Sequence, residues 1–175
     1  SARLDYKARN RKNCKYHMKE AVKDINFTVE KGESVAYIGS NGAGKSTTIK
    51  MLTGILKPTS GNICINGLDP YKHRIQSTKN IGVVFGQRTQ LWWDIPIRES
   101  FSMLKEIYEI PNSVYDANIK YFGEILGVSE FMGYPARKLS LGQRMRADIV
   151  ASLIHNPPVI YLDEPTIGLD VAVKE

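Results

Sequence analysis

The sequence has 175 residues, of which 42% are hydrophobic and 24% are charged, proportions that fit a globular protein and exclude a disordered or fibrous chain. It holds no run of about 18 consecutive apolar residues, the length that a membrane-spanning helix needs. The cysteines, Cys14 and Cys64, lie far apart, and no histidine stands at ligand spacing from them or from another histidine. We therefore expect a cytosolic protein without a zinc site.

The net charge of +6 lies mostly in the N-terminal segment, where seven basic and two acidic residues precede residue 21. Such a segment is compatible with a solvated arm, with contact to anionic lipid headgroups and with binding to nucleic acid. Only Tyr6 and Tyr16 accompany the charges, which is little for a surface that stacks bases. No specific nucleic acid is therefore expected as a partner.

In chain order, the first half of the sequence combines short strands with one helix. Apolar residues at 25, 27 and 29 alternate with polar ones and indicate a half-buried strand. The β-rich stretch "SVAYI" leads into a glycine loop, after which apolar residues recur at helical spacing. We predict strands at 25–29, 34–38, 63–65 and 81–85, and a helix at 45–56 that ends before Pro58.

After residue 87 the pattern becomes helical. Prolines punctuate helical segments predicted at 97–110 and 114–126, and a strand pattern resumes at 158–162. The helical part therefore looks inserted between strands of one α/β core. We expect a β-rich part of the core with the glycine loop at 1–86, a helical subdomain at 87–157 and a return to the core at 158–175.

The glycine loop "GSNGAGKS", residues 39–46, matches the phosphate-loop pattern G-x-x-x-x-G-K-[ST] and stands between a predicted strand and a predicted helix. Its glycines would let N–H groups point inward around phosphate oxygens, and the helix N-terminus would add its dipole. Lys45 would reach the terminal phosphates, and Ser46 would coordinate Mg²⁺. The alternative is a chance glycine-rich turn. The candidate ATP-binding residues are Gly39, Ser40, Asn41, Gly42, Ala43, Gly44, Lys45, Ser46 and Thr47.

Two adjacent acids, Asp163 and Glu164, follow the apolar run at 159–162. A carboxylate at a strand end can hold the same Mg²⁺ that Ser46 contacts. Taken alone, the acidic pair is also typical of a solvated turn. Together with the phosphate loop it indicates a nucleoside triphosphatase site.

Two further features lie between these motifs, "LSLGQ" at residues 139–143 and Gln87 after the strand pattern "IGVVF". With the phosphate loop and "VIYLDE" in this order and spacing, residues 16–170 closely resemble the ATP-binding cassette (ABC) ATPases, the motor subunits of ABC transporters. The resemblance implies a P-loop NTPase (RecA-like) α/β core with an antiparallel β N-terminal part and an inserted α-helical subdomain. It also implies that two cassettes, a homodimer or a pair, face each other head to tail around ATP.

In such a pair the signature residues Ser140, Gly142 and Gln143 would contact the ATP held by the partner's phosphate loop. Their place before a helical pattern at 144–154 agrees, because a hydroxyl and N–H groups at a helix N-terminus would form an anion site. Plain helix capping is the alternative for this serine.

The resemblance assigns roles to further single residues. Tyr16 would stack on adenine, although an exposed residue in a basic strand is the alternative. Gln87 would meet the metal or the attacking water, and Glu164 would act as general base or water-positioning carboxylate. Asp170, in "IGLD", would communicate across the dimer. The implied catalytic set is Glu164, Gln87 and Lys45, and the implied Mg²⁺ ligands are Ser46, Gln87 and Asp163.

The sequence departs from the family pattern at three points. Leu141 stands where the commonest signature has glycine, and Ile167 stands where many members have serine. The family's switch histidine would follow Glu175, and His155 precedes the acids and cannot replace it by position. With Ser1 as first residue, we expect a truncated cassette.

The stretches "FGQRTQLWWDIPIRESF" and "DEPTIGLD" resemble the bacterial branch that drives export through a permease on a separate chain. A membrane permease partner and a cytoplasmic, peripheral location at the inner face of the cell membrane are therefore expected. Trp92 and Trp93 would either anchor that partner or pack in the helical core. Two other functions stay open: a soluble ABC-type ATPase acting on nucleic acid or the ribosome, and a regulatory module that binds nucleotide without turnover.

Overall fold

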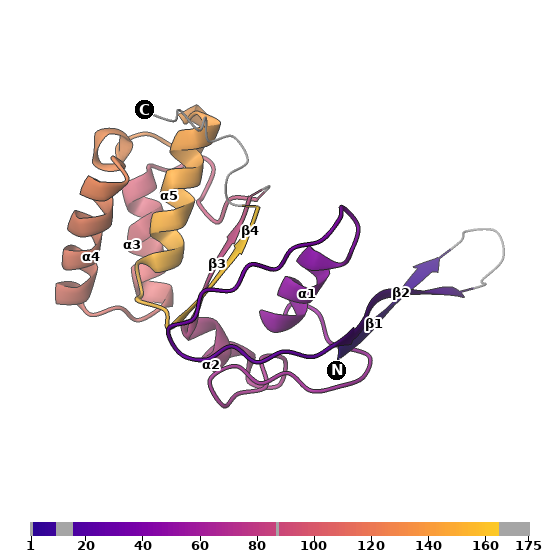
Figure 1. The fold of residues 1–175 in the computed structure, drawn as a ribbon. Coiled ribbons are helices and arrows are strands. Elements are labelled where there is room, and N and C mark those ends of the chain that lie inside the picture. Colours follow the sequence, from indigo (N-terminus) through magenta and orange to yellow (C-terminus); the bar gives the residue numbers. More distant parts are fainter. Residues whose placement is uncertain (1, 10–15, 87, 165–175) are drawn as a thin grey trace, which may run out of the picture. The chain divides into compact units, whose positions relative to one another are not determined.

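The computed structural model describes residues 2–9, 16–86 and 88–164, with side chains from residue 21 onward. The chain divides into two compact units, Ser1–Thr78 and Lys79–Glu175. Its elements (Figure 1) are β1 (Ala2–Arg9), β2 (Tyr16–Ile25), α1 (Lys45–Leu52), α2 (Arg74–Lys79), β3 (Ile81–Phe85), α3 (Ile97–Ile107), α4 (Asn112–Ile125), the 3-10 helices η1 (Ser129–Phe131) and η2 (Ala136–Lys138), α5 (Leu141–Leu153) and β4 (Val159–Asp163).

The first unit contains an antiparallel ribbon, α1 and all but the last residue of α2. β1 pairs with β2 in a register that runs from Arg9 opposite Tyr16 to Ala2 opposite Ile25, with an irregularity next to Leu4. α1 lies against β2, and Met51 on α1 and Val22 on β2 are buried. α1 ends at Leu52, four residues before the predicted end. The reason is a tightened turn, in which the N–H of Gly54 donates to the carbonyl of Met51.

Two predicted strands of the first unit are wrong. Residues 34–38 belong to no strand, and Val35, Tyr37 and Ile38 are exposed. Residues 63–65 contribute only an isolated bridge between Ile65 and Leu68. The predicted strand at 25–29 also fails beyond Ile25, where β2 ends. A β-rich pattern describes side chains that suit a pleated surface, but it does not supply the neighbouring strand.

The second unit combines a parallel strand pair with three helices. β3 and β4 pair in parallel, with Ile81 opposite Val159 and Phe85 opposite Asp163. β3 lies at the predicted 81–85, and β4 lies one residue later than the predicted 158–162. Figure 1 shows α3, α4 and α5 beside these strands, and α5 contacts β3, α3 and α4. The structure thus mixes helices and strands as expected for an α/β fold.

The helices of the second unit bury one face each, as their sequence periodicity requires. On α3 the buried residues Ile97, Ser100, Phe101 and Leu104 recur at helical spacing. The core of the unit comprises Leu91, Ile97, Phe101, Leu104, Ile110, Val128, Phe131, Ala136, Leu139, Ala147, Val150, Ala151 and Ile154. The core therefore anchors α5, the helix that begins directly after the signature serine.

Among the residues that the structure describes, no helix combines the length and the apolar character that crossing a membrane would require.

Candidate functional site

The phosphate loop, residues 39–46, is closed by its own lysine. The Nζ atom of Lys45 donates to the carbonyl oxygens of Gly39 at 2.6 Å and Ser40 at 2.9 Å. The N–H of Ala43 donates to the carbonyl of Ser40 at 3.1 Å, so the loop forms a turn. α1 starts immediately afterwards, and first-turn N–H groups have no carbonyl partner within their own helix. The arrangement presents a cation and a helix N-terminus together, as an anion site needs.

Gly44 is the residue that fits this loop against β2. It caps α1 with a φ of 89°, a left-handed conformation that favours glycine. A Cβ atom at this position would lie 2.6 Å from the carbonyl oxygen of Ala21 and 2.9 Å from Cγ2 of Val22. Both the backbone conformation and the space thus exclude a side chain, which explains the glycine before the lysine.

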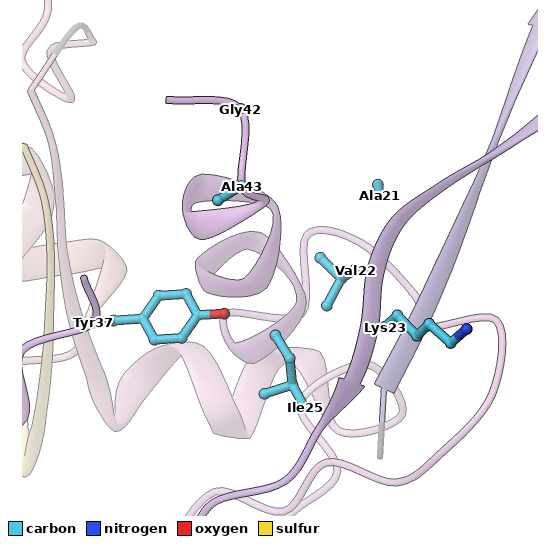
Figure 2. Close-up of a pocket in the computed structure, with 7 residues that line it drawn as sticks. All are labelled: Ala21, Val22, Lys23, Ile25, Tyr37, Gly42 and Ala43. Carbon is cyan, nitrogen blue, oxygen red and sulfur yellow. The ribbon is translucent and has the colours of Figure 1, made fainter. Parts of the chain in front are cut away.

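An open pocket of ≈ 390 Å³ adjoins the phosphate loop (Figure 2). Its walls come from β2, from the stretch before the loop and from the loop itself. In Figure 2 the Tyr37 side chain points toward Ile25, and the loop residues lie at the start of α1. The lining residues are Ala21, Val22, Lys23, Ile25, Tyr37, Gly42 and Ala43. Apolar side chains such as Val22 and Ile25 line it together with polar surface, and such a mixed pocket beside an anion site can hold an organic group attached to phosphates.

Sequence reasoning identified the loop part of this pocket but missed the wall from β2 and Tyr37. Residues 21–25 lie in the same strand as Tyr16, but their sequence "AVKDI" does not alternate, so no local pattern marked this wall. Tyr16 begins β2 opposite Arg9, and its side chain lies outside the described residues.

The acidic pair lies at the carboxyl end of β4, beside the chain that leads to Gln87. The N–H of Gly86 donates to the carbonyl of Asp163 at 2.8 Å. A Cβ atom at Gly86 would collide with the carbonyl oxygen of Glu164, so the close approach of the two strand ends requires glycine. Gln87 and Asp170 themselves lie outside the described residues.

Glu164 adopts a φ of 53°, a left-handed backbone conformation that costs a non-glycine residue on the order of 1–3 kcal/mol. The side chain is exposed at the end of β4. Strained backbone of this kind gathers at functional sites, where the surrounding structure holds it. Asp24, Asn66, Glu109 and Asn156 share this conformation, so the role of Glu164 as a positioned carboxylate stays a prediction.

The donor set fits Mg²⁺, which takes oxygen ligands from carboxylates and hydroxyl groups. Ser46 is the second residue of α1, in the first unit, and Asp163 is the last residue of β4, in the second unit. No group of three or more histidine, cysteine or acidic side chains could hold a metal within the described part of the chain.

The signature serine caps α5. The Ser140 Oγ accepts from the N–H of Gln143 at 3.2 Å, and the Ser140 N–H donates to Oε1 of Gln143 at 2.9 Å. This is a capping box. It starts the helix at Leu141, three residues before the predicted start, with the Leu141 side chain exposed.

Two side chains that sequence reasoning did not select meet in the second unit. Asp148 on α5 is 6% exposed, and its Oδ1 accepts from the hydroxyl of Thr89 at 3.0 Å and the N–H of Gln90 at 2.9 Å. Burial raises the pKa of Asp148 to about 6, against the opposing effect of these hydrogen bonds and of the Arg144 charge. The two groups stand 59 residues apart in sequence, so no local pattern announces the contact.

The two tryptophans are surface residues. Trp92 is 37% and Trp93 47% exposed, so the alternative that they pack in the helical core is wrong. The guanidinium of Arg144 lies 4.6 Å from the centre of the Trp93 ring, a cation–π contact. The second tryptophan is therefore held against the start of α5 while much of it faces solvent.

The ring of His155 is held by an aromatic stack and one polar contact. Its ring stacks on Tyr108 at 4.0 Å, and its Nε2 lies 3.1 Å from the carbonyl of Ile81. Burial lowers its pKa. These contacts agree with the expectation that this histidine does not replace a catalytic one.

Comparison with known sequences finds one matching family and several relatives. The profile of the family described as ABC transporter matches residues 22–167. The ABC transporter ATP-binding protein NatA of Bacillus subtilis (strain 168) is 35% identical over 152 residues, which are 87% of this chain and 62% of NatA. The probable multidrug ABC transporter ATP-binding protein YbhF of Escherichia coli (strain K12) is 31% identical over 86% of this chain and 26% of YbhF. The chain thus spans only part of these relatives.

A solved structure shares the fold over nearly the whole chain. The ATP-binding cassette MJ0796, determined as a dimer in a post-hydrolysis state bound to ADP and Pi, superposes with a TM-score of 0.81 at 26% identity. The similarity covers 97% of this chain and 74% of that one. The α/β P-loop cassette fold expected from the sequence is thereby confirmed.

Proposed function

Since this chain belongs to the ABC transporter family, we propose that it binds Mg-ATP and hydrolyses it as the motor subunit of a transporter. The observation that carries the proposal is the phosphate loop, where Lys45 closes a glycine turn at the N-terminus of α1. This geometry suits the β- and γ-phosphates of a nucleotide.

ATP would lie with its phosphates on residues 39–47 and its base in the pocket beside β2. The apolar wall of Val22 and Ile25 supports a place for the base and ribose, and Tyr16, at the start of the same strand, would stack on adenine. Lys45 would turn from its two carbonyl partners to the terminal phosphates. It would exchange two neutral acceptors for charged ones, which make stronger hydrogen bonds.

Hydrolysis would proceed by in-line attack of water on the γ-phosphorus, with the bond to the β–γ bridging oxygen breaking and ADP and phosphate as products. Glu164 would align the water and accept its proton. Ser46, Gln87 and Asp163 would hold Mg²⁺, which when bound neutralises charge on the phosphate oxygens. The Gly86–Asp163 hydrogen bond supports a fixed position for the strand end that carries Asp163 and Glu164.

A second cassette would complete the site. Ser140, Gly142 and Gln143 stand at a helix N-terminus, which suits the γ-phosphate bound by the facing cassette. ATP would then close the head-to-tail dimer and hydrolysis would release it, with Asp170 communicating across the interface. The dimeric state described for MJ0796 supports this arrangement.

The partner in the membrane would be a separate permease, and export is the proposed direction. The similarity to YbhF, a probable multidrug ABC transporter ATP-binding protein, supports export. The subunit would be cytoplasmic and peripheral at the inner face of the membrane. Within the cassette, we retain the division into core segments 1–86 and 158–175 and a helical subdomain 87–157.

The deciding experiment measures Mg²⁺-dependent ATP turnover against protein concentration. A composite site requires two subunits, so turnover per subunit should rise with concentration until the dimer saturates. The Glu164→Gln variant should lose at least about a hundredfold in turnover, as expected for a lost acid–base group, while still binding ATP.

Glu130→Gln is the matched control, because Glu130 is an exposed acid on η1 in the same unit, and it should leave turnover unchanged. Turnover per subunit that is independent of concentration would contradict the composite site. Tight ATP binding without turnover in the full chain would replace the motor function by that of a regulatory module.

A further inference from the structure

A buried carboxylate on α5 has no role in the proposed chemistry. Asp148 is 6% exposed and shares its helix with the fully buried Ala147, Val150 and Ala151. Placing a carboxylate in such surroundings costs free energy unless it is hydrogen-bonded. Its partners therefore indicate what it does.

All the hydrogen bonds described for Asp148 toward other elements go to one short segment. Its Oδ1 accepts from the Thr89 hydroxyl and the Gln90 N–H, and its backbone carbonyl accepts from Nε2 of Gln90 at 3.0 Å. The Thr89 Oγ1 also accepts from the N–H of Leu91 at 3.1 Å. Three hydrogen bonds thus fasten residues 89–90 to a single turn of α5.

The chain on the other side of Gln87 is fastened to a different element. The N–H of Gly86 donates to the carbonyl of Asp163 on β4, and the N–H of Arg88 donates to the carbonyl of Phe85 on β3, at 2.8 and 2.9 Å. The residues on the two sides of Gln87 are thus bonded to different elements. Gly86 is bonded to the end of β4, which carries the acidic pair, and residues 89–90 are bonded to the signature helix.

The second attachment, Asp148, lies on the same helix that Ser140 caps. Asp148 lies eight residues after Ser140 in α5, a distance of about 12 Å along a helix axis. A second contact runs parallel to it, since Arg144 on the same helix covers the Trp93 ring. Residues 89–90 and 93 thus all contact the helix that begins after Ser140.

We infer that Asp148 is a positioning residue that joins the segment after Gln87 to the signature helix, so that both ATP-contacting regions of this unit move as one body. The inference rests on the proposed function, because it takes Gln87 and Ser140 as groups that contact ATP. An apolar residue would serve packing at this position equally well. A carboxylate instead gives directional bonds to a backbone N–H and a hydroxyl.

A matched control is a residue that stabilises α5 without contacting the segment after Gln87. Asn118 on α4 also binds the end of α5, with Nδ2 donating to the carbonyl of Ile154 at 2.8 Å and to Oδ1 of Asn156 at 3.0 Å. It therefore fastens the same helix to a segment that does not lead to Gln87. Asn118→Ala should leave turnover and the segment at 89–91 unchanged.

The test compares Asp148→Ala, Asp148→Asn and Asn118→Ala in the full chain by amide hydrogen exchange, Mg-ATP affinity and turnover. In Asp148→Ala the Gln90 and Leu91 amides should exchange about tenfold faster, as expected when a hydrogen bond of this kind is lost. Turnover at saturating ATP should fall about tenfold with ATP affinity within threefold of wild type. Asp148→Asn should restore most of both, because its amide oxygen accepts from the same donors.

Added ATP should slow exchange at residues 89–91 and at the start of α5 together in the wild type, and at only one of the two in Asp148→Ala. Unchanged exchange in Asp148→Ala, or an equal loss of turnover in Asn118→Ala, would overturn the inference. If Asp148→Ala does not fold, Thr89→Val removes the hydroxyl bond to Asp148 together with the acceptor of the Leu91 N–H; exchange at the Gln90 amide is then the readout, and it should rise by less than in Asp148→Ala. If the wild-type chain binds ATP without hydrolysing it, the proposed motor function is refuted, but the inference about Asp148 is not. The change in hydrogen exchange on adding ATP would then still decide the role of Asp148.

Discussion

Asp148 is also the residue through which pH should act on stability. Burial raises its pKa to about 6, above the ordinary value of an aspartate. The folded chain therefore holds this proton more tightly than the unfolded chain. The resulting stabilisation is complete below about pH 4 and is lost as pH rises through about 6, because the buried carboxylate must then carry its charge.

Asp148→Asn should remove this dependence. Between pH 5 and pH 7.5 the wild type should lose roughly 1 kcal/mol of unfolding free energy more than the variant, measured by urea denaturation at both values. Burial lowers the pKa of His155, which acts in the opposite sense, but both chains contain this histidine and its effect cancels in the comparison. Asn118→Ala carries no ionisable change and should follow the wild type. Equal slopes for Asp148→Asn and the wild type would contradict the raised pKa.

At the scale of single residues, the sequence predicts well a site formed by residues that are neighbours in the chain. It predicts poorly a contact between residues that are far apart in the chain. Lys45 and the glycines of the phosphate loop act through backbone conformation within eight residues, so the pattern alone contains the geometry. The contact of Asp148 with Thr89 depends on the packing of α5 against β3. That packing is a tertiary property, and a single aspartate in a helix gives no sign of it.

At the scale of elements, the capping box of α5 separates two roles that one serine can have. Ser140→Ala should cost about 1 kcal/mol of stability through the lost cap. Ser140→Asp should keep the stability, because aspartate is an equally good N-cap and its charge suits a helix N-terminus. If Ser140 also contacts the partner's γ-phosphate, the added carboxylate repels it, and turnover should fall at least tenfold.

Thermal melts and ATP turnover of both variants distinguish these roles. Plain capping requires Ser140→Asp to be as active as the wild type and Ser140→Ala to lose only stability. A stable and inactive Ser140→Asp would support the phosphate contact.

Element prediction succeeded where the chain carries its own boundary signals. The apolar run of β3 lies at the predicted 81–85, and prolines at the starts of α3 and α4 mark both helices. α5 begins earlier than its apolar pattern because Ser140 and Gln143 form the capping box. The predicted strand at 34–38 failed because a strand depends on a hydrogen-bonded neighbour, which the stretch itself cannot provide.

At the scale of the whole molecule, the proposed function requires a surface of this chain that contacts a membrane partner. Trp92 and Trp93 follow the segment that Asp148 holds, and both are partly exposed. Exposed tryptophans are favoured as anchors of protein interfaces. The Arg144 contact and the hydrogen bond from the Trp92 N–H to Ser100 Oγ at 3.2 Å keep this segment ordered, which limits the entropy lost on binding.

Replacing both tryptophans with alanine should therefore weaken the proposed complex with a permease at least tenfold, since anchors of this kind each contribute on the order of 2 kcal/mol. ATP affinity should stay within twofold, because the phosphate loop belongs to the other unit of the chain. Co-purification with the permease and nucleotide titration measure the two effects. Tyr121→Ala, which removes an aromatic residue 59% exposed on α4, is the control and should leave the complex intact. Complex formation that survives the loss of both tryptophans would move the permease contact to another surface of this unit.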